Sequence, residues 1–470
     1  MRGFQLLGVA FLLAAACLRG QEASKGPAEG LDQKFRAAMA QYESGRFTDA
    51  AVALEGLLRE VPESFEVHEL LGLVYSAQSQ NGKANPHLDK AVRLKPNSAA
   101  ARMNLAINLV QLGKLAPAES EFKKALELEP QNYDANHNLG ELYVRAGKVE
   151  AATRYLEQAQ HINPGSADNG YDLSLAYMVT GRLADARQLL QGLLKRKDSA
   201  ELHNLLGEVE EKDGKFVAAA NEYELAAHLD PSESNLFDWG GELLLHRTLD
   251  PAIQVFQDAA ARYPNSPRVA IGLGIAYYAR GNYDEAVKSL LKAADLSPGD
   301  ARVYPFLSRA YDSSPSQAEE VITRFRRYAE QEAGNGRAQY YYAMSLWKGK
   351  RAQDPHLDLA QIARLLEKAI ALDPSLAEAH LQLGNLYSDQ QKYAEAIPEY
   401  QRALQLNSDL PDAHYRLGQA YVHTGDKDRA QEQLQAYQKI REQHLADLEK
   451  QRAEVRQFVY AAKDGQGARQ

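Results

Sequence analysis

The sequence predicts an all-α solenoid built from repeated pairs of antiparallel helices, and three observations support this fold class. A small residue recurs every 33 or 34 positions along most of the chain. The apolar residues around it fall three or four positions apart, which is the spacing of one face of an α-helix. Glycines and prolines interrupt this pattern at regular places, where helices would have to end. A fixed period of this length indicates a stacked repeat architecture.

The recurring small residue marks the first helix of each unit. It stands at Gly72, Ala106, Gly140, Ser174, Gly207, Gly240, Gly274, Ser308, Gly384 and Gly418. The unit around Gly140 shows the rest of the pattern, which comprises Leu139, Tyr143, Gly147, Ala152, Leu156, Ala159 and Pro164. We expect Gly140 and Ala152 to let the two helices of the pair approach closely, while Tyr143 and Leu156 fill the space around them.

Two kinds of residue predict where the helices end. A glycine in the middle of a unit can adopt the left-handed conformation that ends a helix, and such glycines stand at Gly113, Gly147, Gly181, Gly214, Gly281 and Gly425. A proline cannot continue a helix interior. The units are therefore expected to close at Pro62, Pro96, Pro130, Pro164, Pro231, Pro264, Pro298 and Pro374.

These columns resemble the tetratricopeptide repeat, whose pattern of an aromatic residue, Leu-Gly, Tyr, Ala, Phe and Pro they match. About twelve such units cover roughly Leu31 to Ile440. We expect repeats 1–9 at residues 31–333 and repeats 10–12 at residues 334–444, followed by a capping helix and tail at residues 445–470. The resemblance implies a right-handed superhelical solenoid whose concave wall is lined by the first helix of each unit.

Three units and the C-terminal end depart from the regular pattern. The fifth unit ends at Asp198 instead of a proline, the ninth replaces its glycine turn by residues 313–316, and the tenth has roughly six extra residues between Gly349 and Asp358. We interpret these as loops that tolerate changes of length, and as places where the array could bend between two sub-arrays. A long charged helix from Gln431 to Val459 would cover the apolar face of the last unit. A short coiled coil with a partner is the alternative for that helix.

The first twenty residues differ from the rest of the chain and predict export. Arg2 is followed by an apolar stretch from Phe4 to Ala16, which is too short to cross a bilayer comfortably and ends in small residues suited to cleavage. We interpret residues 1–20 as a signal peptide and residues 21–30 as a flexible leader. The mature protein is then expected to be periplasmic or envelope-associated.

Cys17 is the only cysteine of the chain, and it stands close to where a lipoprotein signal places its lipidated residue. The leucine of that pattern lies one position too early, at Leu13. Lipidation of Cys17 therefore stays open beside cleavage nearer Gly20 or Gln21. A lipid at Cys17 would be the protein's only attachment to a membrane.

Composition and motifs argue against nucleic-acid binding and against catalysis. The chain has 54 basic and 63 acidic residues, a net charge of −9, whereas phosphate contacts need clustered Lys and Arg. It contains no HExxH, GxSxG, P-loop or CxxC motif. We expect the protein to have no enzymatic activity and no cofactor, since the repeats occupy nearly all of the chain given. Four histidines precede a repeat glycine by four residues, and we expect them to pack between helices rather than bind metal: His68, His203, His380 and His414.

Two positions of each first helix should face the concave groove. The position two residues before the small residue carries Asn104, Asn138, Asp172, Asp238 and Gln382. The position three residues before the small residue carries Met103, His137, Tyr171, Phe237, Ile271, Tyr341, Leu381 and Tyr415. Amides can donate to and accept from an extended peptide backbone, and aromatic residues anchor interfaces. The consecutive asparagines resemble in part the asparagine ladder of some family members. Lys and Arg are sparse in these two columns, with Arg416 the exception.

These observations predict an exported scaffold or adaptor that binds a protein or peptide, of a kind the sequence does not identify, in its concave groove. Two other functions stay open at this point. One is an accessory factor or carrier in the assembly of envelope polysaccharide or lipid, which rests on the expected location. The other is a self-assembling structural protein that associates through its terminal units.

Overall fold

The computed structural model describes residues 27–314, 316–350 and 358–443. These residues form α-helices joined by short turns, without a strand among them, so the all-α fold class is confirmed. Within the same residues, no helix combines the length and the apolar character that crossing a membrane requires. The expected signal peptide, Cys17 and the expected tail at 445–470 lie outside the described residues.

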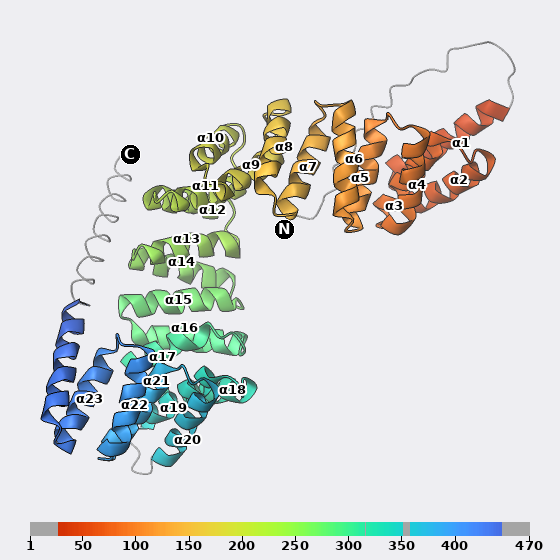
Figure 1. Cartoon of the computed structure of the whole chain (residues 1–470). Coiled ribbons are helices and arrows are strands. Elements are labelled where there is room, and N and C mark those ends of the chain that lie inside the picture. The colour runs from red at the N-terminus through yellow and green to blue at the C-terminus, as the bar shows by residue number, and fades with distance from the viewer. Residues whose placement is uncertain (1–26, 315, 351–357, 444–470) are drawn as a thin grey trace. The chain divides into compact units, whose positions relative to one another are not determined.

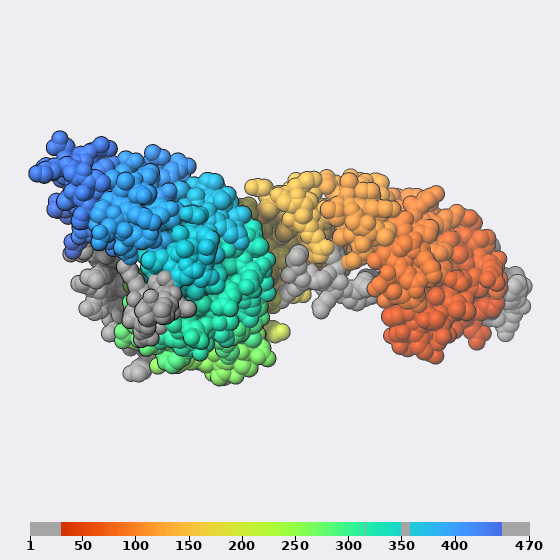
Figure 2. Space-filling model, turned by 90° about the horizontal axis from the view of Figure 1, so that it is seen from below, coloured from red at the N-terminus to blue at the C-terminus, as the bar shows by residue number. Residues whose placement is uncertain are grey.

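The chain divides into two compact units, Met1–Asp198 and Ser199–Gln470, and each is a stack of antiparallel helix pairs (Figures 1 and 2). The described helices of the first unit are α1 (Pro27–Glu43), α2 (Phe47–Glu60), α3 (Phe65–Ala77), α4 (Asn81–Leu94), α5 (Ala99–Gln111), α6 (Leu115–Leu128), α7 (Tyr133–Arg145), α8 (Val149–Ile162), α9 (Ala167–Val179) and α10 (Leu183–Leu194). Odd-numbered helices are the first helices of their pairs, and even-numbered helices are the second.

The second unit continues the same alternation of first and second helices. Its helices are α11 (Ala200–Lys212), α12 (Phe216–Leu229), α13 (Glu233–Leu245), α14 (Leu249–Arg262), α15 (Pro267–Arg280), α16 (Tyr283–Leu296), α17 (Val303–Ser313), α18 (Ala318–Gln331), α19 (Gly336–Lys350), α20 (Leu359–Leu372), α21 (Ala377–Asp389), α22 (Tyr393–Leu406) and α23 (Pro411–Thr424). A further helix at 427–443 pairs with α23 and reaches the end of the described residues. The described helices thus form twelve pairs, the number that the sequence predicts.

The recurring glycine brings the two helices of a pair into contact, as the sequence predicts. A Cβ atom added at Gly140 would lie 2.6 Å from the Leu156 side chain, and one added at Gly207 would lie 2.8 Å from the ring of Tyr223. The large residue stands sixteen positions after the glycine, on the second helix of the same pair. The same relation joins Gly72 to Leu88, Gly240 to Phe256, Gly274 to Leu290, Gly384 to Tyr400 and Gly418 to Leu434.

An alanine twelve positions after the small residue completes this contact. Ala84, Ala118, Ala152, Ala186, Ala219, Ala252, Ala286 and Ala396 are fully buried. A methyl group is the largest side chain that leaves room for close helix approach at such a position. The ninth and tenth pairs, which depart from the sequence pattern, bury the larger Val321 and Ile362 near this place instead.

In the part of the chain that the structure describes, the turns inside the pairs contain a left-handed residue. Gly113 and Gly281 have φ values of 72° and 91°, a region that glycine enters without steric cost. Ser79, Arg247 and Gln391 take the corresponding place in pairs without a glycine, with φ values of 58°, 58° and 61°. The backbone conformation of the turn is therefore retained where the residue type is not.

The structure also shows what happens where the sequence departs from its period. The boundary between the two units falls at Asp198, where the fifth pair ends without a proline. In the ninth pair Gln317 adopts the left-handed conformation, with φ of 56°, and α18 follows directly. Helix α1 begins at Pro27, so the last residues of the expected leader are helical. The insertion of the tenth pair falls mainly on residues 351–357, outside the described part.

Where a tyrosine stands three residues after the small residue, it joins several of the first helices to the preceding second helix. Tyr143 donates to Glu119 at 2.9 Å and Tyr177 donates to Glu157 at 2.9 Å. In the second unit Gln257 and Gln401 donate to the hydroxyls of Tyr277 and Tyr421, both at 2.8 Å. These bonds connect neighbouring pairs, and they explain why Tyr143, Tyr177, Tyr277 and Tyr421 are tyrosine rather than phenylalanine.

Candidate binding surface

The first helices form one wall of each stack, which we call the first-helix face. Within the first unit α3, α5, α7 and α9 contact one another in succession, and within the second unit α11, α13, α15, α17 and α19 do so. Among the described second helices only α16 and α18 approach each other comparably. Since the first helices crowd together while the second helices spread, the first-helix face is the concave side of each stack. Neighbouring first helices also exchange side-chain hydrogen bonds along it.

Two of the predicted groove residues in the first unit are hydrogen-bonded to a neighbouring first helix. Asn104 on α5 is buried, with 5% exposure, and donates to Glu69 on α3 at 3.3 Å. Burial raises the pKa of Glu69 to about 7, and the bond from Asn104 lowers it in part. His137 on α7 is half-buried, lies 3.1 Å from the side-chain oxygen of Asn169 on α9, and stacks on Tyr133.

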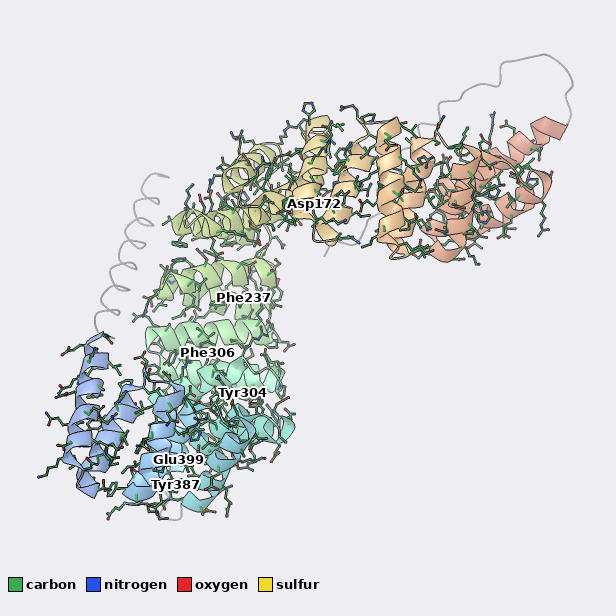
Figure 3. All side chains as sticks on the ribbon, in the orientation of Figure 1. Asp172, Phe237, Tyr304, Phe306, Tyr387 and Glu399 are labelled. Carbon is green, nitrogen blue, oxygen red and sulfur yellow. The ribbon has the colours of Figure 1, made fainter. Side chains whose placement is uncertain are left out.

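The predicted asparagine column does not form a uniform ladder. Asn138 is half-buried and donates to the carbonyl of Asp134 in its own helix at 2.7 Å, whereas Asn104 faces Glu69. Asp172 and Tyr171 are half-buried on α9, and Figure 3 labels Asp172 in this first unit. A partner segment would meet Asn138 and α9 more readily than Asn104.

In the second unit Phe237 and Asp238 of α13 contact different neighbouring first helices. Phe237 is half-buried, packs edge-on against Phe256 at 5.7 Å, and lies under the guanidinium of Arg268 at 4.0 Å (Figure 3). Asp238 accepts a hydrogen bond from Asn204 on α11 at 3.0 Å. Phe237 therefore faces α15, while Asp238 faces α11.

The remaining predicted residues lie on α19, α21 and α23. Tyr341 is half-buried against the ring of Phe325 at 5.8 Å. Gln382 is half-buried and accepts from Asn385 in its own helix at 3.1 Å. Tyr415 is 39% exposed, and its ring lies 5.3 Å from that of Tyr437 on the helix at 427–443.

The residues three positions before the small residue are of two kinds, aliphatic and aromatic, and the two kinds differ in burial. The aliphatic residues Met103, Ile271 and Leu381 are buried, at 5%, 8% and 6% exposure, and belong to the core. The aromatic residues keep part of their rings accessible. An aliphatic side chain ends beside its neighbouring helix, whereas an aromatic ring extends beyond it, and so only the aromatic members can contact a partner.

Sequence reasoning missed several residues of this face. Arg268 and Arg309 were outside the two columns considered, and so was Glu208. Glu208 is exposed, yet burial and the nearby carboxylates of Asp238 and Glu211 raise its pKa. This combination is expected for a carboxylate on a concave wall, where many atoms surround a group that solvent still reaches. Glu208 and Arg309 each stand one residue after the recurring small residue, and this shared column was the signal available in the sequence.

The four histidines before the repeat glycines pack between the helices of their pairs, which confirms the expectation. His203 lies 2.5 Å from Glu222 and His380 lies 2.7 Å from Glu399, each pair of residues linking the first helix to the second. His68 lies 3.1 Å from His87, and His414 lies 2.7 Å from Gln433. In the described residues no group of three His, Cys, Asp or Glu side chains is arranged to hold a metal ion.

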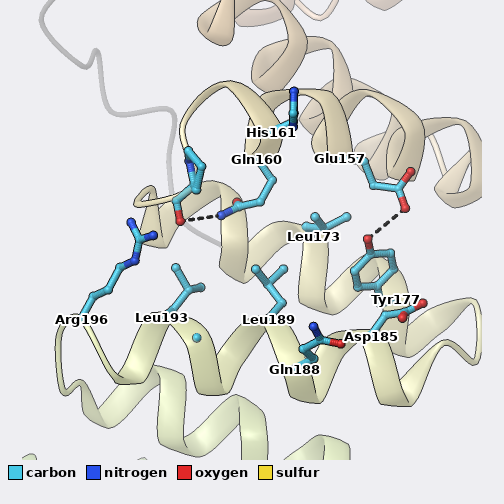
Figure 4. A pocket seen from close by; sticks show the side chains of 12 residues that line it. Glu157, Gln160, His161, Leu173, Tyr177, Asp185, Gln188, Leu189, Leu193 and Arg196 are labelled. Atoms are coloured by element: carbon cyan, nitrogen blue, oxygen red, sulfur yellow. Dashed lines mark hydrogen bonds between the residues drawn. The ribbon is translucent and has the colours of Figure 1, made fainter.

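A cavity of about 570 Å³ lies in the first unit between α8, α9 and α10 (Figure 4). Leu173 and Tyr177 of α9 contribute to its lining, and the Tyr177 hydroxyl donates to Glu157 at 2.9 Å. Its other walls come mostly from the second helices α8 and α10, so it does not belong to the first-helix face. His161 lines it, but no nucleophile is hydrogen-bonded to this histidine in the described structure.

Comparisons with known proteins agree with this architecture. Models described as tetratricopeptide repeat match residues 35–99 and 103–167, residues 143–209 and 243–310, residues 365–397, and residues 411–444, and a model described as TPR repeat matches residues 384–425. Comparison with curated protein sequences finds no match.

Solved structures with a similar fold include PilW, PilF and YrrB. PilW, a widely conserved type IV pilus biogenesis factor, is 23% identical, with 44% of this chain and 96% of that chain covered and a TM-score of 0.39. PilF of Pseudomonas aeruginosa is 18% identical, with 44% and 95% covered and a TM-score of 0.39. YrrB, a TPR protein with an unusual peptide-binding site, is 22% identical, with 39% and 95% covered and a TM-score of 0.33. These likenesses concern the fold alone.

Proposed function

The chain is a tetratricopeptide repeat protein, and we propose that it is a scaffold that binds extended peptide or protein segments on its first-helix face. Repeats of this family are typically non-enzymatic and mediate contacts between proteins. The proposal rests on one observation: the aromatic residues three positions before the small residue are still partly accessible to solvent. Tyr171, Phe237 and Tyr341 remain half-buried, although each first helix is packed on its pair and on its neighbours.

Half-buried aromatic residues beside amides suit an extended segment. Aromatic side chains supply much of the binding energy of protein interfaces at small cost in conformational entropy. Amide groups such as that of Asn138 can exchange their intrahelical bond for bonds to a peptide backbone. The concave wall then supports the segment along several successive first helices.

A double variant on the first-helix face tests this function. Asn138→Ala with Tyr171→Ala should abolish crosslinking to the partner that photo-crosslinking in the native cell identifies, because both changes remove contacts on α7 and α9. Far-UV circular dichroism should show unchanged helicity. Glu150→Ala with Arg154→Ala, at exposed positions of the second helix α8, serves as the matched control. Retention of every partner by the first-helix variant would show that another surface binds.

We also propose export of the protein, with residues 1–20 as the signal. The intact mass of the chain from the native cell separates the possible products. A lipidated chain begins at Cys17, and a chain cleaved without lipidation begins near Gln21. Recovery of the chain with Met1 or Arg2 still present, in the cell's soluble interior, contradicts export.

A further inference from the structure

Arg268 is an arginine of the first-helix face without an acceptor. It is the second residue of α15, and its guanidinium lies over the Phe237 ring of α13 at 4.0 Å. Its Nε and Nη2 atoms are shielded from solvent, and no hydrogen-bond acceptor reaches either of them. Donors of a charged group that are kept from water without an acceptor are unfavourable. An anionic group that met this guanidinium after the side chain had turned toward solvent would remove that cost.

A second contact between an arginine and an aromatic ring lies farther along the same face. The guanidinium of Arg309 on α17 lies 5.8 Å from the ring of Phe306, which is half-buried on the same helix (Figure 3). Burial raises the pKa of Tyr341 on α19; the nearby positive charges of Arg337 and Arg309 lower it in part, and the negative charge of Glu378 on α21 raises it. Two guanidinium groups therefore lie close to the Tyr341 hydroxyl.

These three arginines differ from several other arginines between α14 and α18. Within the described residues, no carboxylate forms an ion pair with Arg268, Arg309 or Arg337. Elsewhere in the same stretch arginine and aspartate are joined at 2.6 to 3.2 Å, in the pairs Arg262–Asp258, Arg280–Asp250, Arg302–Asp300, Arg324–Asp295 and Arg327–Asp295. The chain carries a net charge of −9, so acidic side chains are not scarce. In the described part of the chain the exposed Arg247 and Arg326 of this stretch also form no ion pair, and the charges of Asp373 and Arg337 act on each other without a close contact. Arg268 differs from these arginines because it combines the lack of an ion pair with donors that are shielded from solvent.

The geometry points to an acidic segment of a partner protein as the ligand of the first-helix face from α13 to α19. This inference rests on the proposed scaffold function and specifies the chemistry of its partner. Arginine presents a planar set of donors that fits a carboxylate in two-point contact, and it keeps its charge when stacked on an aromatic ring. Phe237, Phe306 and Tyr341 supply apolar contacts for the intervening residues of the segment.

The spacing of the helices limits the sequence of the segment. Packed helix axes lie about 8–10 Å apart, and an extended chain advances about 3.3 Å per residue. Arginines on successive first helices therefore match acidic residues about three positions apart. The segment should not extend to α11, because Glu208 and Asp238 lie on that side of α13 and would repel it.

The test measures binding of a fluorescein-labelled peptide to the full chain by fluorescence anisotropy. The probe has glutamate at every third position and serine elsewhere, and two further peptides replace glutamate by glutamine or by lysine. The glutamate peptide should bind, and its affinity should fall as salt is raised. Equal binding of the glutamine peptide, stronger binding of the lysine peptide, or no binding of the glutamate peptide each overturns the inference.

Arginine variants locate the site. Arg268→Gln with Arg309→Gln should weaken binding of the glutamate peptide at least about tenfold, because two charge-assisted contacts are lost. Arg262→Gln with Arg280→Gln makes the same change in net charge at ion-paired positions and should leave binding unchanged. Arg268→Lys, which keeps the charge without the planar donors, should bind with intermediate affinity. Equal effects of the two double variants would mean that only net charge matters, which contradicts a site.

Two further outcomes separate this inference from the scaffold function. If alginate, an acidic polysaccharide, binds at the arginines while the glutamate peptide does not, the ligand is not a protein segment. If the partner crosslinked in the cell is lost in the Asn138 and Tyr171 double variant but kept in the Arg268 and Arg309 double variant, the scaffold function stands and the acidic-segment inference fails. Loss of that partner in both double variants, but not in their controls, supports both.

Discussion

Replacing Phe256 by alanine should lower the free energy of unfolding by about 3–5 kcal/mol, the range measured for large aromatic residues removed from cores. Phe256 on α14 is fully buried. A Cβ atom added at Gly240 on α13 or at Gly272 on α15 would lie 3.0 Å or 2.5 Å from its ring. The ring therefore fills the space between two successive first helices. Its loss leaves a cavity that the backbone of three helices would have to close.

Urea unfolding followed by circular dichroism checks this result, with Leu245→Ala as the control. Leu245 on α13 is 70% exposed, so its truncation should change the free energy of unfolding by less than about 0.5 kcal/mol. Because repeat arrays can unfold in parts, hydrogen exchange should also show faster opening of α13 to α16 than of α3 to α6. Equal stability of the two variants would contradict the packing role assigned to Phe256.

The sequence was sufficient to predict the helix pairs because their packing depends on residue size at fixed spacing. Gly140 and Leu156 illustrate this: a residue without a side chain must oppose a large one, and the sixteen-residue separation places them on the two helices of a pair. The same argument predicted the left-handed turn at Gly147. Such constraints recur in most units, and a period therefore reveals them.

The candidate site was harder to predict because the contacts of each side chain depend on residues in neighbouring helix pairs. Asn104 and Asn138 occupy the same column, yet Asn104 is buried against Glu69 and Asn138 bonds its own helix. The role of Arg268 depends on Phe237, which lies 31 positions earlier, and on the absence of a nearby acceptor. Helical spacing identifies which residues share a face. It does not give the partners of each side chain, since those are set by the stacking of neighbouring pairs.

Because of Glu242, the free energy of unfolding of the second unit should fall as pH rises toward neutrality. Glu242 stands two residues after Gly240, in a column that is apolar at Leu142 and Leu386, and its side chain is 2% exposed. Burial and the nearby charge of Glu211 raise the pKa of Glu242 to about 7. The folded state therefore holds a proton that the unfolded state has released between about pH 4.5 and 7. The free energy of unfolding falls as pH rises across this window, and the loss is complete above it.

Glu242→Leu should remove this dependence and stabilise the protein by up to about 3 kcal/mol at pH 8, with little effect at pH 4.5. His246, whose Nε2 lies 3.3 Å from Glu242, acts in the opposite sense, because burial lowers its pKa and favours unfolding in acid. The Tyr223 hydroxyl, whose pKa burial raises, stays protonated throughout this range. The difference in the free energy of unfolding between variant and wild type therefore reports the protonation of the Glu242 carboxyl group, together with its coupling to His246.

Thermal unfolding of both proteins from pH 4.5 to pH 8 measures this difference. Glu285→Gln is the control, because Glu285 is paired with Lys288 at 2.7 Å on the exposed surface of α16, where such pairs contribute little to stability. The Glu285 variant should follow the wild-type curve within about 0.5 kcal/mol. If the Glu242→Leu curve runs parallel to the wild-type curve at all pH values, the buried carboxyl group is ionised throughout the range, and burial does not control its protonation.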